Sequence, residues 1–228
     1  MNQPLPVGDE KARAVRTMFD SIARRYDLVN RVMTFGMDVG WRRKTVASLA
    51  LPVGARVLDL ACGTGDLCRE LINGGYAPTG IDFSVEMLRA AHVRAPLVAA
   101  DILRLPVPDG YADGVTCGFA LRNVVSLETL FAEIVRVVRP GGRIALLEVS
   151  EPRNAFMRRG HAIYFNKVVP KIGGLLSDRS AYEYLPRSVA YLPPPDELLA
   201  MLRKAGFADA RRTLFGGGIA QLLTGTRA

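Results

Sequence analysis

The stretch that decides the fold is VLDLACGTGDL at residues 57–67. An apolar run leads into a glycine-rich turn, and the turn leads into a helical pattern at about 66–73, which predicts a buried strand followed by a helix. Glycine has no Cβ and allows positive φ, so the backbone at Gly63 and Gly65 can approach a bound molecule closely. We therefore expect a nucleotide-like cofactor at this turn.

The same rhythm continues along the chain. Short apolar runs separated by Gly or Pro alternate with helical patterns, which is typical of βαβ units with a parallel sheet. We expect strands at about 55–60, 77–82, 97–101, 112–118 and 142–149, helices at about 66–73, 84–93, 126–139 and 195–206, and strand-like runs near 208–215 and 219–225. The expected fold is α/β and Rossmann-like, a mostly parallel, doubly wound sheet with helices on both faces.

Two segments interrupt this rhythm. Residues at about 10–50 combine helical patterning with many Arg and Lys residues, which predicts an N-terminal helical cap. Residues at about 152–192 alternate cations with large apolar side chains, and here we expect a helical lid or insertion that contacts the substrate. A length of 228 residues fits one domain over residues 1–228.

The composition limits the partners without choosing one. A formal net charge of +8 fits nucleic acid, an anionic membrane surface or a solvated basic exterior. No apolar run reaches the roughly 18 residues of a spanning helix, and the first residues do not form a secretory signal, so we expect a cytoplasmic protein that at most touches the inner face of the cell membrane. Three Cys without a CxxC pair and two His predict neither a disulfide nor a metal site.

Two acidic residues end the next expected strands. Asp82 lies nineteen residues after Gly63, where a carboxylate can accept hydrogen bonds from both ribose hydroxyls. Asp101 ends the third strand, beside the place of an adenine ring. A dinucleotide fingerprint would have a small residue in place of Cys68, and a P-loop Gly-Lys-Ser/Thr is absent. The three strand ends predict one adenosine-shaped crevice. The alternative is that the glycine turn and the terminal Asp residues only mark the ends of strands.

Four motifs resemble class I S-adenosylmethionine methyltransferases: DLACGTGDL, GIDFSVEML, AADILRLPVPD and VRPGGRIALLEVS. The tract FDSIARRYD at 19–27 and the segment FALRNV at 119–124 are similar, more closely, to the ubiquinone/menaquinone biosynthesis C-methyltransferase family. The late segments GGLLS at 173–177 and YEYLPRSV at 182–189 resemble its menaquinone branch. The resemblance covers roughly residues 15–226.

This resemblance implies S-adenosylmethionine-dependent C-methylation of a polyprenyl quinol, which converts 2-demethylmenaquinol to menaquinol. The residues that it places around S-adenosylmethionine are Gly63, Thr64, Gly65, Asp82, Asp101 and Ile102. Gly118 stands where some family members have a Ser contact, so that contact is missing here.

Methyl transfer to a ring carbon sets requirements on the acceptor side. Loss of the proton from the neighbouring phenolic hydroxyl pushes electron density onto the carbon, so a base or a charge stabiliser near that hydroxyl helps. Our candidates are Tyr26, Arg122 and Asn123, with His161 as a further choice. An Arg after the fourth strand lies at the rim where open α/β sheets bind ligands, and its guanidinium can stabilise a phenolate. An ordinary salt bridge for Arg122 and plain packing for Tyr26 are the alternatives.

Other functions stay open on the sequence alone. One is methyl transfer by the same fold to a benzoquinol, another small acceptor or RNA, and another is a cofactor-binding scaffold of a quinone-synthesis complex without turnover. No aromatic and basic RNA-binding run is evident, so we expect no nucleic-acid partner. The mixed segment at 152–192 predicts a groove for a prenyl tail and peripheral contact with anionic lipid, or a helix packed on its own core. A homodimer is left open.

Overall fold

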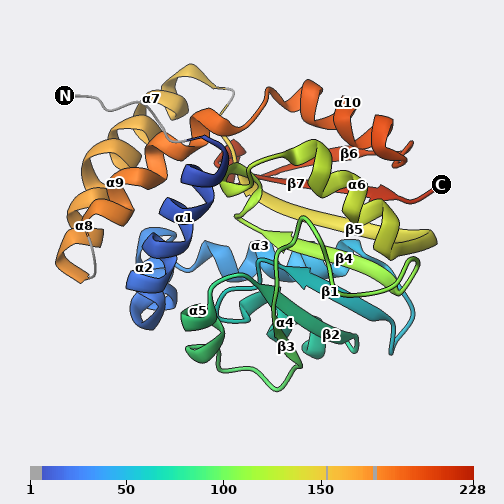
Figure 1. The fold of residues 1–228 in the computed structure, drawn as a ribbon. Helices are drawn as coiled ribbons and strands as arrows, with labels where there is room; N and C mark the ends of the chain where they lie inside the picture. The colour runs from blue at the N-terminus through green and yellow to red at the C-terminus, as the bar shows by residue number, and fades with distance from the viewer. Residues whose placement is uncertain (1–6, 153, 177–178) are drawn as a thin grey trace.

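The computed structural model describes residues 7–152, 154–176 and 179–228, and a seven-stranded sheet lies at the centre of these residues (Figure 1). The strands are β1 (Arg56–Leu60), β2 (Ala77–Asp82), β3 (Leu97–Ala99), β4 (Ala112–Gly118), β5 (Val138–Val149), β6 (Arg211–Phe215) and β7 (Ala220–Thr226). Their order is β3-β2-β1-β4-β5-β7-β6; β1 to β5 are parallel, and β7 is antiparallel to both of its neighbours. The strand order reverses between β1 and β4, and open α/β sheets bind ligands outside the carboxyl ends of the strands at such a point.

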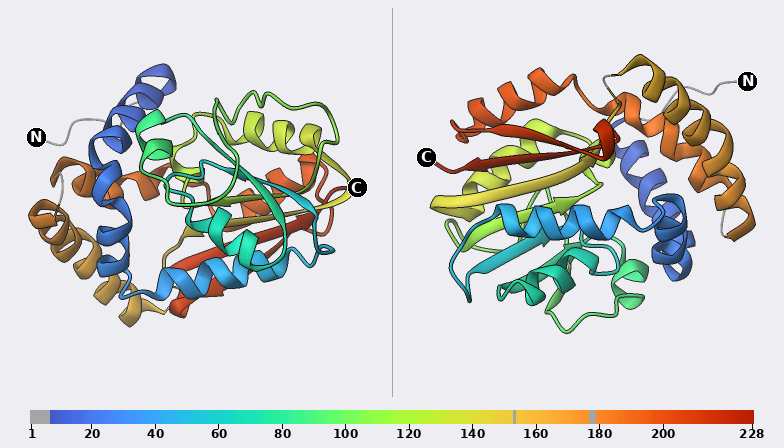
Figure 2. Two further views of the ribbon diagram at one scale, coloured as in Figure 1. Left: turned by 90° about the horizontal axis from the view of Figure 1, so that it is seen from below. Right: turned by 180° about the vertical axis from the view of Figure 1, so that it is seen from behind.

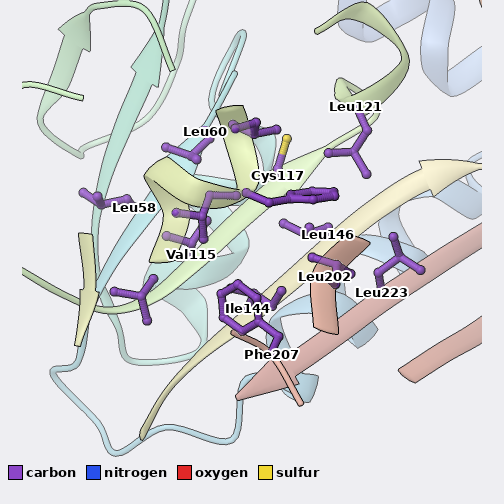
Figure 3. Close-up of a cluster of buried hydrophobic side chains, with 14 of the residues drawn as sticks. Leu58, Leu60, Val115, Cys117, Leu121, Ile144, Leu146, Leu202, Phe207 and Leu223 are labelled. Atoms are coloured by element: carbon purple, nitrogen blue, oxygen red, sulfur yellow. The ribbon is translucent and has the colours of Figure 1, made fainter. Parts of the chain in front are cut away.

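Helices cover both faces of the sheet (Figures 1 and 2). The helices on the two faces and beside β2 are α3 (Met37–Ser48), α4 (Asp66–Asn73), α5 (Val85–Arg89), α6 (Leu127–Val137) and α10 (Pro195–Ala205). The apolar stripe of α6 is fully buried, with Leu130, Phe131 and Ile134 at most 1% exposed. Burial of each such side chain contributes roughly 1.5–3 kcal/mol. Figure 3 shows part of this cluster, where Ile144 of β5 lies among Leu202 of α10 and Phe207.

The remaining helices gather beyond the carboxyl ends of the parallel strands (Figures 1 and 2). They are α1 (Gly8–Ile22), the 3-10 turn η1 (Ala23–Arg25), α2 (Tyr26–Met33), α7 (Ala155–Ile163), the π-helical turn η3 (Tyr164–Val168), α8 (Val169–Leu176) and α9 (Arg179–Ser188). In the described residues, none of the helices is long and apolar enough to cross a bilayer. The roles of cap and lid for these segments, and the single domain over the whole chain, stay predictions.

The expected α/β fold is confirmed, and its boundaries differ from the sequence pattern in two places. The Pro140-Gly141-Gly142 turn lies inside β5, because β4 pairs with Val138 and then resumes at Arg143, so the intervening residues form a bulge. A Cβ at Gly142 would stand 2.8 Å from two backbone oxygens, which explains why no side chain fits there. The helix expected at 84–93 ends at Arg89 instead, and the chain after it packs back against the glycine turn.

Candidate functional site

The glycine turn, residues 61–65, connects β1 to α4 in a left-handed backbone conformation. Ala61, Gly63 and Gly65 all have positive φ, at 52°, 55° and 85°. Gly63 lines a cavity of about 490 Å³, which we call the first cavity. At Gly65 a Cβ would lie 2.6 Å from a methyl carbon of Val93, so this glycine allows the loop after α5 to pack closely. Of the two predicted glycines, Gly63 therefore reaches the cavity and Gly65 supports the turn from behind.

Asp82 ends β2 and ties the glycine turn to α5. One carboxylate oxygen accepts the backbone N–H of Gly63 and the other accepts that of Ser84, both at 2.8 Å. The residue is 5% exposed, and burial raises the pKa of the carboxyl above its ordinary value, although the backbone N–H donors oppose that shift. A carboxylate oxygen has two lone pairs, so each oxygen keeps one for a hydroxyl in the first cavity. These free acceptor positions on Asp82 fit the two hydroxyls of a ribose.

The first cavity brings four of the predicted cofactor residues together. Gly63, Asp82, Asp101 and Ile102 all line it, from the ends of three neighbouring strands. The carboxylate of Asp101 accepts the backbone N–H of Leu103 at 2.9 Å, which shapes the loop after β3. The lining also includes Ala12, Phe19, Gly118, Phe119, Ala120 and Asn123. The cavity has the polar rim and apolar walls of a nucleoside site.

Thr64, the last of the six predicted cofactor residues, lines a different space. Its hydroxyl donates to the carboxylate of Asp27 in α2 at 2.5 Å, and it lines a separate polar cleft below η1. Two similar contacts stand beside it: the hydroxyl of Ser84 donates to Asp20 at 2.5 Å, and the guanidinium of Arg31 lies 3.4 Å from Asp66. These three contacts fasten the N-terminal helices to the loops around the first cavity.

Sequence reasoning did not identify these fastening residues. Asp20, Asp27 and Arg31 are spaced by seven and then four residues, which is the spacing of one helical face. That spacing was the available signal, but nothing in it says which loop the polar face contacts.

A second cavity, of about 520 Å³, lies next to the first. Its walls come from α1 to α3, from the end of β5 and from α7, and they are mostly large apolar side chains. Its lining includes Met18, Ile22, Met33, Phe35, Trp41, Met157, Tyr164, Phe165 and Ile219. Phe19, Tyr26 and Phe119 line both cavities, so the two spaces meet at these three rings.

The shared rings are held by the surrounding backbone and by each other. Phe119 has φ of 58°, a conformation that costs a residue other than glycine about 1–3 kcal/mol. Its N–H donates to the carbonyl of Leu147 at 2.7 Å, which fixes the strained turn after β4. Tyr26 meets Phe19 edge to face at 5.8 Å. Burial raises the pKa of Tyr26, so the phenol stays protonated and can donate a hydrogen bond.

Arg122 and Asn123 are neighbours that face different cavities. Arg122 lines the second cavity, is 4% exposed, and forms an ion pair with Glu148 of β5. Asn123 lines the first cavity, and its amide oxygen accepts the hydroxyl of Tyr184 at 3.3 Å. Burial raises the pKa of Tyr184 to about 12, which keeps that donor protonated. The structure thus gives Arg122 both a salt bridge and a place in a cavity wall.

His161 also lines the second cavity, from α7. Its ring stacks on Phe165 with centroids 5.1 Å apart, and burial lowers its pKa, so the neutral imidazole is favoured. Three of the four acceptor-side candidates, Tyr26, Arg122 and His161, therefore line the second cavity, whereas Asn123 lines only the first.

A buried acid beneath the glycine turn was not predicted. Asp59 of β1 is 0% exposed and accepts hydrogen bonds from the hydroxyl of Thr116 at 2.8 Å and from the thiol of Cys68 at 3.3 Å. Burial raises the pKa of Asp59 to about 7. The only signal in the sequence was one acid inside the apolar run at 57–60.

The sequence model of the ubiE/COQ5 methyltransferase family matches residues 7–227. The chain belongs to this family. It is therefore an S-adenosylmethionine-dependent methyltransferase, as the motifs of the ubiE/COQ5 family led us to expect.

Two relatives of the ubiE/COQ5 methyltransferase family illustrate the similarity. Demethylmenaquinone methyltransferase of Roseiflexus castenholzii is 45% identical over 98% of this chain and 97% of the relative. The ubiquinone/menaquinone biosynthesis C-methyltransferase UbiE of Geobacter sulfurreducens is 39% identical over 96% of this chain and 90% of the relative.

Solved structures agree with the fold. A methyltransferase from Thermotoga maritima has a TM-score of 0.66 at 19% identity, over 93% of this chain and 99% of that one. Phosphoethanolamine N-methyltransferase 2 of Haemonchus contortus, solved with S-adenosyl-L-methionine, has a TM-score of 0.60 at 14% identity, over 82% of this chain and 52% of that one. At these identities the similarity concerns the fold alone.

The arrangement at Asp82 predicts a loss of affinity for the methyl donor. We expect Asp82→Ala to weaken S-adenosylmethionine binding about tenfold or more, because hydrogen bonds to a charged acceptor contribute about 1.5–3 kcal/mol. Titration calorimetry measures this directly. Asp113→Ala, in β4 at the opposite end of the sheet, is the matched control and should bind like the wild type. Unchanged affinity in a folded Asp82→Ala protein would mean that the ribose lies elsewhere.

Asp59 predicts a pH dependence of stability. Its pKa is about 7 in the folded protein and ordinarily 3.8, so between these values the folded protein keeps a proton that the unfolded chain has lost. The free energy of unfolding therefore falls as pH rises through this window, and Asp59→Asn removes the effect. Urea titrations at several pH values measure this difference. The free energy of unfolding of Asp59→Asn should rise relative to that of the wild type from about pH 4 to about pH 7 and keep this relative gain above pH 7.

Asp209→Asn provides a control of opposite sign. The backbone N–H of Thr226 holds the pKa of Asp209 below its ordinary value, so this carboxylate stabilises the fold at neutral pH. We expect Asp209→Asn to have a lower free energy of unfolding than the wild type at neutral pH. The same pH dependence of the free energy of unfolding in Asp59→Asn and in the wild type would contradict the buried-acid interpretation.

Proposed function

We propose that the chain transfers the methyl group of S-adenosylmethionine to a ring carbon of 2-demethylmenaquinol, giving menaquinol. The observation that supports this substrate is the junction of the two cavities: a polar-rimmed space for a nucleoside meets a larger apolar space at Phe19, Tyr26 and Phe119. A small polar acceptor or an RNA base would leave these apolar walls without contacts, whereas a naphthoquinol with a prenyl tail would cover them. The names of the two relatives above support the same reaction.

On the donor side, we propose that Asp82 accepts the ribose hydroxyls and that Asp101 and Ile102 border the adenine. Gly63 lets the backbone approach the amino-acid part of the donor. The bound sulfonium supplies an electrophilic methyl group. Displacement at that carbon is in line, so the protein's contribution is to hold the acceptor ring behind the methyl group and to keep water out. The three shared rings stand at the place where this exclusion is needed.

On the acceptor side, we propose that Arg122 stabilises the phenolate that forms when the hydroxyl beside the reacting carbon loses its proton to bulk water, before the ring carbon attacks. The new carbon–carbon bond forms as the bond between the methyl group and sulfur breaks, and loss of the ring C–H proton to water then restores the aromatic ring. A guanidinium stays charged at all relevant pH values and needs no proton transfer for this role. Tyr26 donates a hydrogen bond to the same oxygen, and Asn123 orients the quinol ring from the first cavity. His161, kept neutral by burial, lies in the same cavity as a partner for the second hydroxyl of the quinol.

A methyl-transfer assay tests this function. Chemically reduced demethylmenaquinone with a short prenyl tail and S-adenosylmethionine should give the methylated naphthoquinone by mass spectrometry. We expect Arg122→Gln to lower kcat roughly hundredfold, as loss of an oxyanion-stabilising donor does, with donor affinity unchanged. Arg139→Gln, at the far end of the sheet, is the control and should keep wild-type kcat.

The same assay separates the alternatives. A benzoquinol or an RNA offered under the same conditions should be methylated far more slowly than the naphthoquinol. Preference for either would replace the proposed substrate. Binding of S-adenosylmethionine in calorimetry without turnover on any acceptor would favour the scaffold.

We also propose that the mouth of the second cavity docks on an anionic lipid bilayer. Phe35, which lines the cavity, is 75% exposed, and its ring lies 5.8 Å from that of Tyr164 in the neighbouring η3 turn. Phe156 is 88% exposed and Met157 is 43% exposed on α7. Exposed cations lie on α7, on the η3 turn and on α8, which follow one another along the chain: Arg158, Arg159, Lys167 and Lys171. Exposed apolar rings with flanking cations are the pattern of a peripheral membrane face, and such a face would let the prenyl tail enter from the bilayer.

Sedimentation with vesicles tests this docking. Binding should require anionic lipid, weaken with salt, and drop roughly fivefold for each of Arg158→Gln and Arg159→Gln, since a cation near such a surface contributes about 1 kcal/mol. Phe156→Ser should weaken binding as well. Val53→Ser removes a side chain that is 85% exposed in the loop before β1 and is the matched control. Absence of salt-sensitive binding, or self-association through this face without lipid, would contradict the proposal.

A further inference from the structure

Glu148 is an acid in the interior of β5, and it is 0% exposed. Removal of a carboxylate from water costs several kcal/mol unless charges and hydrogen bonds compensate. Here one oxygen pairs with the guanidinium of Arg122 and accepts the N–H of Val149 at 2.7 Å, while the other accepts the backbone N–H of Arg122 at 3.1 Å. Both oxygens of Glu148 thus hold one residue, by its backbone and by its side chain.

The guanidinium of Arg122 is also held from two other directions. Its Nε–H donates to the hydroxyl of Ser188 at 3.1 Å, and Nη1 donates to the carbonyl of Phe119 at 2.7 Å. Ser188 is itself fixed, because its hydroxyl donates to the carbonyl of Leu185 at 2.8 Å. Contacts from β5, from α9 and from the turn after β4 therefore converge on this side chain.

These contacts leave one edge of the guanidinium for a ligand. Five N–H groups are present on the side chain, and those on Nε and Nη1 are taken up by Ser188, Phe119 and Glu148. Within the described parts of the chain, Nη2 donates no hydrogen bond. Arg122 lines the second cavity, so the geometry presents a preoriented donor to that space.

We propose that Glu148 is a positioning residue for methyl transfer, acting through Arg122. The inference rests on the proposed function, in which Arg122 stabilises the phenolate. The carboxylate holds the guanidinium in one rotamer before the acceptor binds, so no reorganisation is needed as charge develops on the ring oxygen. Without Glu148, the side chain of Arg122 can adopt other rotamers, and its N–H donors then move away from the ring oxygen of the quinol.

Two substitutions at Glu148 separate position from charge. Glu148→Gln keeps the length and one acceptor oxygen but loses the ion pair, and Glu148→Asp keeps the charge but withdraws it by one methylene. We expect both to lower kcat by roughly tenfold to hundredfold, because a misplacement of about 1 Å costs on the order of a hundredfold. The KM and the dissociation constant for S-adenosylmethionine should stay within about twofold of wild type, since the donor's own contacts are intact.

A double-mutant cycle on kcat tests whether Glu148 acts through Arg122. In an Arg122→Gln background, Glu148→Gln should cause no further loss, because the group that it positions is already gone. The double variant also has no unpaired buried charge, so it folds even if Glu148→Gln alone is destabilised. Glu133→Gln, which removes a carboxylate paired with Arg136 at the other end of the sheet, is the matched control and should keep wild-type kcat in both backgrounds.

The outcomes distinguish this inference from the proposed function. If Arg122→Gln keeps wild-type kcat, the role of Arg122 is wrong, and the positioning role goes with it. If Arg122→Gln loses activity but Glu148→Gln causes a further equal loss in its background, Arg122 keeps its role and the positioning role of Glu148 is overturned. Wild-type kcat in folded Glu148→Asp and Glu148→Gln proteins overturns it as well.

Discussion

The bond pair at Asp82 is the constraint on which the rest of the site depends. A single carboxylate fixes the glycine turn through Gly63 and the start of α5 through Ser84. Because Ser84 also binds Asp20, and Thr64 binds Asp27, the same two loops anchor the N-terminal helices. Those helices carry the walls where the two cavities meet. The polar contacts at one strand end therefore set the geometry of both cavities.

Several buried charges at this end of the molecule are paired with opposite charges. Arg122 and Glu148 connect the turn after β4 to β5, and Arg42 pairs with Asp38 while its guanidinium faces the ring of Phe119 at 5.5 Å. Replacement of such pairs by apolar residues is often neutral or stabilising, so fold stability alone does not account for them. Their common feature is that they orient groups that line the second cavity. Among the described residues, Asp59 and Asp82 form no ion pair, and burial raises the pKa of both carboxyls.

The convergence of strand ends at the first cavity could be predicted from the sequence, whereas contacts between distant segments could not. Gly63, Asp82, Asp101 and Ile102 converge because parallel strands bring their carboxyl ends to one edge, and that rule needs no side-chain detail. The hydroxyl of Thr64, a predicted donor contact, binds Asp27, thirty-seven positions earlier in the chain, and no local pattern specifies that bond. The pairing of Arg122 with Glu148 spans β4 and β5, and no local pattern specifies it. The second cavity is formed by helices from both ends of the chain, so its existence depends on tertiary packing.

The two borders of the sheet have a consequence for self-association. A strand at the border presents unpaired N–H and C=O groups that can template pairing with another chain. β3 has only three residues, and β6 begins with Arg211 and Arg212, of which Arg211 is exposed. The exposed charge of Arg211 on β6 disfavours pairing with another chain, and β3 offers only three residues to a partner. Continuation of the sheet from one copy of the chain into the next is therefore disfavoured at both ends.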